Sequence, residues 1–257
     1  MDDLVALYDT LPGIALHFIR AGAFVSVVPV FGSQTESKMY RLILAVSIGS
    51  IMWWTGGQHS PDVGNVLGLG VLAVREVLIG LSLGFAARSM IFMLGIAGEV
   101  IAHEMGFSMS RIMNPETGTA TTAMAQLFEI MGFMLIFQLD LHHELLRILQ
   151  RTYSLVPVGE SFDFAVVYNN LANLVARAID FGLQYAIPIF GVMILLTVTL
   201  VVLARAVQNI NLMEFSFGLR ILLAFVASIY FLVEGEPFLR YVFDQLLLDV
   251  GDLVKGA

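Results

Sequence analysis

Three short segments of the sequence carry residue types that could do chemistry, and the first two suggest hydrolysis. His103-Glu104 begins like the helical zinc-protease motif, in which two histidines hold one metal ion, but Phe107 occupies the second histidine position. Gly106 to Ser110 nearly matches the nucleophile turn of serine hydrolases, yet it ends in serine and follows an apolar helix where a strand is required. A hydrolase that uses His103 or Ser108 is therefore a weak hypothesis.

The third segment is His142-His143-Glu144. Imidazoles and a carboxylate are ligand types that zinc accepts, so this segment could bind a metal ion. Paired histidines at a helix end also serve as polar anchors at a membrane surface, and we favour that interpretation. The sequence contains no cysteine, which excludes disulfides and thiolate sites, and no glycine-rich phosphate loop. We therefore expect no cofactor, no metal centre and no enzymatic activity.

Single charges embedded in apolar segments are more informative. Arg88 and Glu99 interrupt one long apolar segment, and Glu129 lies inside another. A charge at the bilayer centre costs roughly 2.5–3.5 kcal/mol on insertion scales, so these residues should face protein, water or each other. On one helix Arg88 and Glu99 would lie about 20° apart around the axis, which predicts a shared, buried face and electrostatic coupling.

These charges also leave a second class of protein open. In a self-contained small-solute permease, Arg88, Glu99 and Glu129 would be the substrate or proton sites. An internal inverted repeat would favour that class, and the sequence shows no convincing repeat.

Two glycines in the same apolar segment predict a packing surface. Gly80 and Gly84 are the ends of a small-xxx-small pattern, which lets two helix backbones approach closely. We expect another helix to lie against them.

The elements that position these residues are membrane helices. Of the 257 residues, 58% are hydrophobic and only 13% are charged, and the mean hydropathy is +0.85. The apolar residues form long blocks without the alternation of a β-barrel, so helices must satisfy the backbone in lipid. The sequence thus predicts an all-α integral membrane protein with several long and broken helices, and one helical membrane domain over residues 1–257.

The blocks differ in length and charge. Leu42 to Pro61 and Gly182 to Ala204 are long enough to span a bilayer without a charge. Val63 to Ala102 is cut by charges so that no uncharged piece spans alone, which suggests a helix packed inside an assembly.

The net charge is −8 and the basic residues are scattered singly, which excludes a nucleic-acid partner. The acidic start of the chain lacks the basic region of a signal peptide, so we expect the first apolar block to be retained.

The segment from Gly106 to Thr122 is polar and interrupted. Met105, Met109 and Met113 would form a stripe if a helix continued through them. Asn114, Pro115 and Gly118 predict a break in that helix. At membrane depth a broken segment is tolerated only where it packs against protein or lines a cavity, which suggests a constriction.

Together these features resemble the export-gate subunit family of type III secretion that is called FliR in flagella. The block order agrees throughout, although the late segment Ser216 to Arg220 lacks the prolines usual in the family. The matching features are Arg20 with Pro29 to Gly32, Leu83 to Arg88, Gly98-Glu99, Met105 to Ser108, Asn114 to Gly118, and Ala204 to Ala206 with Asn211.

The resemblance implies a function and a set of partners. Members of this family join FliP and FliQ subunits in a helical gate through which unfolded export substrates pass, and FlhB lies against its cytoplasmic side. It also implies location in the bacterial inner membrane at the flagellar basal body, with some apolar helices above the bilayer plane. The segment matching Gly106 to Thr122 plugs the closed pore in the family. Phe107, Met109, Arg111 and Met113 are accordingly the candidate plug residues, and Asn114, Pro115 and Gly118 shape the turn.

Overall fold

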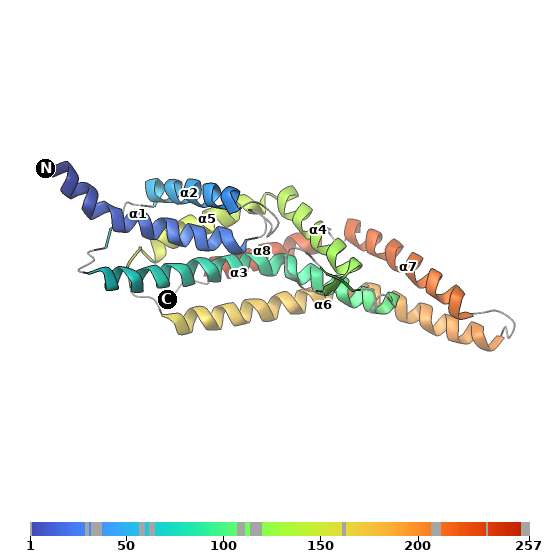
Figure 1. The fold of residues 1–257 in the computed structure, drawn as a ribbon. Coiled ribbons are helices and arrows are strands. Elements are labelled where there is room, and N and C mark those ends of the chain that lie inside the picture. Colours follow the sequence, from blue (N-terminus) through green and yellow to red (C-terminus); the bar gives the residue numbers. More distant parts are fainter. Residues whose placement is uncertain are drawn as a thin grey trace. The chain divides into compact units, whose positions relative to one another are not determined.

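The structure is a computed structural model that describes residues 2–28, 31, 38–56, 60–61, 65–106, 111–113, 120–160, 163–206, 212–234 and 236–252. Within these residues the chain forms eight helices and one pair of short strands (Figure 1), which confirms the all-α fold class. The elements are α1 Asp2–Val27, α2 Lys38–Thr55, α3 Val66–Met105, β1 Arg111–Met113, β2 Ala120–Thr122, α4 Ala123–Gln138, α5 Leu141–Leu155, α6 Phe164–Ala206, α7 Leu212–Glu234 and α8 Glu236–Asp252.

Three of the described helices are long and apolar enough to cross a membrane. They contain the segments Thr10–Val27, Val66–Met105 and Phe164–Ala206, and up to five spans result if each of two bent helix pairs counts as one. The predicted span from Gly182 to Ala204 lies inside α6. The predicted span from Leu42 to Pro61 is wrong, because α2 ends at Thr55 and Gly56 follows as a turn.

Helix α3 runs unbroken through every charge that interrupts its apolar segment. It has 40 residues and is apolar around most of its circumference, which is typical of a helix covered on several sides. The charges therefore interrupt the hydropathy of this segment but not its backbone, and they must find partners along the helix.

The chain divides into two compact units by its internal contacts. The first unit comprises Met1–Ser89, Ile136–Val175 and Leu246–Ala257, and the second comprises Met90–Leu135 and Ala176–Gln245. Helices α3, α4, α6 and α8 contribute residues to both.

In the first unit, α1 packs against α2 and α3 (Figure 1). Phe18 of α1 lies directly over Gly49 of α2. A Cβ built on Gly84 of α3 would lie 2.9 Å from Cβ of Val27 and 3.0 Å from the carbonyl oxygen of Phe24. A Cβ on Gly80 would meet the carbonyl oxygen of Arg20. Both glycines thus lie where the backbones of α1 and α3 approach most closely.

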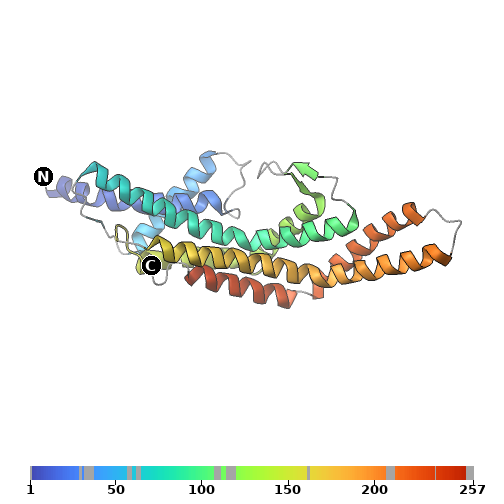
Figure 2. The ribbon, with the colours of Figure 1, turned by 90° about the horizontal axis from the view of Figure 1, so that it is seen from below.

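In the second unit, glycines again mark the helix crossings. A Cβ on Gly98 of α3 would lie 2.6 Å from Cα of Ala125 in α4, and one on Gly182 of α6 would meet the carbonyl oxygen of Met93 at 2.5 Å. Helix α8 runs alongside α6 (Figure 2), and the ring of Phe238 stacks on Tyr185 with centroids 6.4 Å apart. The second unit is therefore built around α3 and α6, with α4 and α8 packed on them.

Candidate functional site

A short β-hairpin follows the end of α3 and leads into α4. The helix ends at Met105, and Gly106 has a φ of +83°, the left-handed conformation that commonly ends helices at a glycine. Strand β1 then pairs antiparallel with β2, with Arg111 opposite Thr122 and Met113 opposite Ala120. Sequence analysis predicted a break in this segment but not the strands.

The helix therefore ends before the Asn-Pro turn that was expected to break it. Because Met113 lies in a strand, no helix carries Met105, Met109 and Met113 as one stripe. Of the candidate plug residues, the structure describes the backbone of Arg111 and Met113 alone. Their side chains, and all of Phe107, Met109, Asn114, Pro115 and Gly118, lie outside the described residues.

The base of the hairpin is attached to α3 by Glu99. The backbone N–H of Thr122 donates a hydrogen bond to Oε1 of Glu99 at 3.1 Å. Thr122 is itself buried, and its Oγ1 accepts a hydrogen bond from the N–H of Ala125 at 3.2 Å, so it caps the first turn of α4. The Glu99 carboxylate thus also lies near the positive end of the α4 dipole. One carboxylate stabilises both the last residue of the hairpin and the start of the next helix.

The other predicted charges occupy packed positions. Arg88 is half-buried on α3, and its predicted coupling to Glu99 stays a prediction. Glu129 of α4 lies over Gly95 of α3, where a Cβ would come within 2.9 Å of its Oε1. The observed partner of Glu99 is a backbone amide, which sequence patterns do not reveal.

Helix α7 reaches the end of α3 through Arg220 and Phe217, which belong to the late segment Ser216 to Arg220. Nη1 of Arg220 donates a long hydrogen bond of 3.5 Å to the carbonyl oxygen of Glu104. Phe217 lies next to Gly106, where a Cβ would be 3.6 Å from its ring. The segment that departs from the family pattern therefore packs against the helix end from which the hairpin begins.

A buried ion pair in the first unit joins two charges that each interrupt an apolar segment. Nε of Arg20 in α1 lies 2.5 Å from Oε2 of Glu76 in α3, and their side chains are 0% and 2% exposed. Nη2 of Arg20 also donates to the carbonyl oxygen of Val156 at 3.0 Å. The general expectation that embedded charges face each other holds for this pair, although sequence analysis did not match the two residues.

An aromatic cluster packs beside the Arg20 guanidinium. Its Cζ lies 4.4 Å from the ring centroid of Tyr153, a cation–π geometry. The other part of the Tyr153 environment is His17, whose ring stacks on it at 4.7 Å and whose carbonyl oxygen accepts the tyrosine hydroxyl at 3.0 Å. Trp53 of α2 lies edge-on to His17 at 5.1 Å. The ion pair therefore lies where α1, α3 and α5 meet, and α2 is added through the contact of Trp53 with His17.

Long apolar helices whose charges are buried against one another define an α-helical integral membrane protein. The chain belongs to the bacterial export proteins, family 1, whose model matches residues 11–246.

Proteins with the name flagellar biosynthetic protein FliR are similar over most of their length. The Bacillus subtilis protein is 27% identical over 229 residues, which cover 87% of each chain. The Caulobacter vibrioides protein is 32% identical over 183 residues, covering 68% of this chain and 70% of its own. The Escherichia coli protein is 22% identical over 237 residues, which cover 92% of this chain and 90% of its own.

Proposed function

We propose that this chain is a subunit of the flagellar type III export gate, in the bacterial inner membrane at the basal body. With FliP-like and FliQ-like subunits it forms the pore through which unfolded substrates pass, and an FlhB-like subunit lies against its cytoplasmic side. The chain acts by packing and gating, without a catalytic residue. The observation that carries the proposal is the family match, together with the flagellar name that its relatives share.

Exposed apolar helix faces support membership of an assembly. On α6, Leu195, Val198 and Val202 are 69%, 56% and 63% exposed. On α7 the exposed side chains also recur at helical spacing. Faces of this kind need lipid or protein to cover them. Neighbouring gate subunits supply such cover, and they also provide partners for the charges that interrupt the apolar segments.

The hairpin between α3 and α4 is the proposed plug of the closed pore. Its base is fixed by Glu99 and by the cap at Thr122, whereas Met109 precedes β1, Met113 ends β1, and the Asn-Pro turn lies between the strands. A plug needs this division, because it must return to one place yet leave when a substrate arrives. Methionine side chains are suited to sealing, since an unbranched thioether repacks without one fixed geometry.

Ion conductance tests the plug. Deleting residues 110–119 removes β1 and the turn while it leaves α3 and α4 in place. We expect the complex to assemble and the resting membrane to leak ions, in liposomes or in cells that carry the complex. Met109→Ala combined with Met113→Ala should leak less than the deletion.

A matched control separates gating from general damage. Arg240→Ala removes only an exposed ion pair with Glu236 in α8, so it should assemble normally and stay tight. A tight membrane with the shortened hairpin, at normal levels of the complex, would mean that the segment only connects two helices. Solute uptake by the purified chain alone, abolished by Glu129→Gln, would instead establish the permease alternative.

A further inference from the structure

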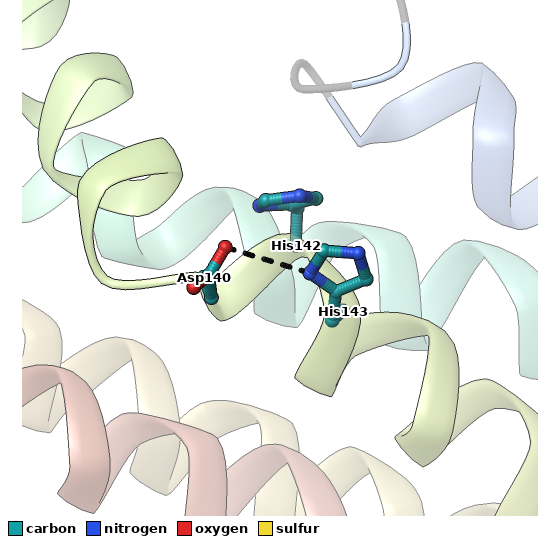
Figure 3. A group of neighbouring side chains, drawn as sticks. All are labelled: Asp140, His142 and His143. Carbon is teal, nitrogen blue, oxygen red and sulfur yellow. Dashed lines mark ion pairs between the residues drawn. The ribbon is translucent and has the colours of Figure 1, made fainter.

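The turn between α4 and α5 brings together three side chains that bind metals. One ligand atom from each of Asp140, His142 and His143 lies within 4.8 Å of the other two. Figure 3 shows the Asp140 carboxylate directed towards the ring of His143, with the His142 ring beside both. The carboxylate Oδ1 is 3.6 Å from Nδ1 of His143, and the two rings have centroids 4.1 Å apart. All three residues belong to the first unit.

The backbone at Asp140 frees its carboxylate for a ligand. Asp140 occupies the N-cap position of α5, where an aspartate normally bonds the first amides of the helix. Here its φ is +56°, a left-handed conformation that is uncommon for residues other than glycine, and its side chain makes no capping hydrogen bond. The left-handed backbone at Asp140 is energetically unfavourable, and α5 begins without a side-chain cap. This conformation places the Asp140 carboxylate beside two imidazoles.

The His142 ring packs against an aromatic neighbour, and one of its nitrogens is shielded from solvent. Leu141 is buried beneath the first turn of α5, and the ring of Phe137 lies 5.2 Å from that of His142. Nδ1 of His142 is shielded from solvent and has no hydrogen-bond partner among the described residues. A shielded nitrogen without a partner is costly, and a bound ligand is one way in which proteins resolve that cost.

Glu144 is not the carboxylate of this group. Sequence analysis considered His142-His143-Glu144, but Glu144 forms an ion pair with Arg147 one turn along α5. The carboxylate that joins the two histidines is Asp140, which precedes them in the chain.

We propose that Asp140, His142 and His143 form a binding site for a divalent transition-metal ion of the zinc class. Two imidazoles and one carboxylate are a ligand set that Zn²⁺ accepts, with the fourth position open to water or to another group. The positive end of the α5 dipole opposes a cation, and the Asp140 charge offsets that effect. Because the three ligands come from four consecutive positions, the site needs no contact between the two units. A bound ion would fix the left-handed turn from which α5 begins.

Titration with Zn²⁺ tests the site on the full-length chain in detergent, purified within its co-expressed complex by an affinity tag that contains no histidines. Competition with a fluorescent chelator should show saturable binding of one ion per chain. His143→Ala and Asp140→Asn should each weaken that binding by about tenfold or more, since each removes one of three ligands. Zn²⁺ should also raise the thermal unfolding midpoint of the unaltered chain and not that of His143→Ala.

His103 provides the matched control. It is an exposed histidine beside a carboxylate, with Nδ1 4.0 Å from Oε1 of Glu104, but that pair offers two ligands instead of three. His103→Ala should leave the affinity for Zn²⁺ within about twofold of the unaltered chain. The proposal is overturned if Zn²⁺ does not bind saturably, or if His143→Ala and His103→Ala bind it equally well. Since export is not measured, either result leaves the proposed function intact.

Discussion

Arg20 and Glu76 meet through a 2.5 Å contact between Nε and Oε2, although 56 residues separate them along the chain. The pair joins α1 to α3, and Nη2 of the same guanidinium reaches the carbonyl oxygen at the end of α5. Such a pair helps to fix how three helices sit within one unit, because both side chains are shielded from water and separating them would leave a buried charge unpaired.

Glu76→Gln and Arg20→Met should each destabilise the chain by about 3–5 kcal/mol, because each leaves one charge buried without its partner. The double variant Arg20→Met with Glu76→Leu should lose much less stability than the two single variants together, because it leaves no buried charge unpaired. Thermal unfolding of the co-expressed complex in detergent measures all three. Arg240→Ala is the control, since its ion pair with Glu236 is exposed and worth no more than about 0.5 kcal/mol. Single variants as stable as this control would show that the pair contributes little.

Gly80→Ala and Gly70→Ala, in the same helix, should change stability in opposite directions. At Gly80 a new Cβ would lie 2.8 Å from Cβ of Ala23 and 3.1 Å from the backbone nitrogen of Phe24, so α1 must shift, at roughly 1–3 kcal/mol. At Gly70 no atom lies within 4 Å, and alanine should stabilise the helix by roughly 0.5–1 kcal/mol. Equal unfolding midpoints for the two variants would contradict the close approach of α1 and α3.

Glu99→Ala should loosen the base of the hairpin. The variant removes the acceptor of the Thr122 amide and a negative charge near the start of α4, for a combined loss of about 1–2 kcal/mol. Hydrogen exchange followed by mass spectrometry should show faster exchange in peptides covering residues 120–126. Glu104→Ala, on the same helix, should leave that exchange unchanged. Unaltered exchange in the Glu99 variant would mean that the carboxylate does not hold the hairpin.

Arg88→Glu should impair assembly of the complex more than Arg151→Glu. Arg88 is half-buried on α3 and is predicted to be coupled to Glu99, whereas Arg151 is exposed on α5. A like charge placed in a buried pair costs more than one placed at a solvated surface. The yield of complex on native gels after co-expression gives the comparison. Similar yields for both variants would show that Arg88 and Glu99 act independently.

Expression of the chain alone should give an unstable or aggregated product, because charge-interrupted apolar helices need protein partners. Co-expression with FliP-like and FliQ-like subunits should give a particle several times the 28.2 kDa of the chain. Particle mass in detergent measures this directly. A stable, functional monomer would refute obligate assembly.

Helix content and membrane character could be predicted from sequence because both depend on local patterns. The long apolar run over Gly182 to Ala204 predicts helix whatever surrounds it, and α6 contains it. The expected end at Pro61 is too late because the segment after Trp54 carries no charge, although it is polar and contains Gly56 and Gly57, and α2 ends at Thr55.

Pairings could not be predicted because they depend on distant segments. Arg20 and Glu76 were each recognisable as a costly charge, but nothing local says which of several opposite charges each one meets. Glu99 bonds a backbone amide, and every residue except proline carries one. The ligand group at Asp140 was missed because its carboxylate is placed by a left-handed backbone, which the sequence Asp-Leu-His-His does not require.

The unbroken length of α3 sets a condition on the membrane around it. Its 40 residues rise about 60 Å, at about 1.5 Å per residue, whereas the hydrocarbon core is only about 30 Å thick. To fit within that thickness the helix would need a tilt of about 60°, beyond the range of about 0–40° seen for membrane helices. A straight helix of this length cannot lie wholly within the hydrocarbon, so part of its apolar surface must be covered by protein, from this chain or from its neighbours. In the proposed gate, that cover would come from neighbouring subunits, and hydrophobic mismatch would then favour assembly.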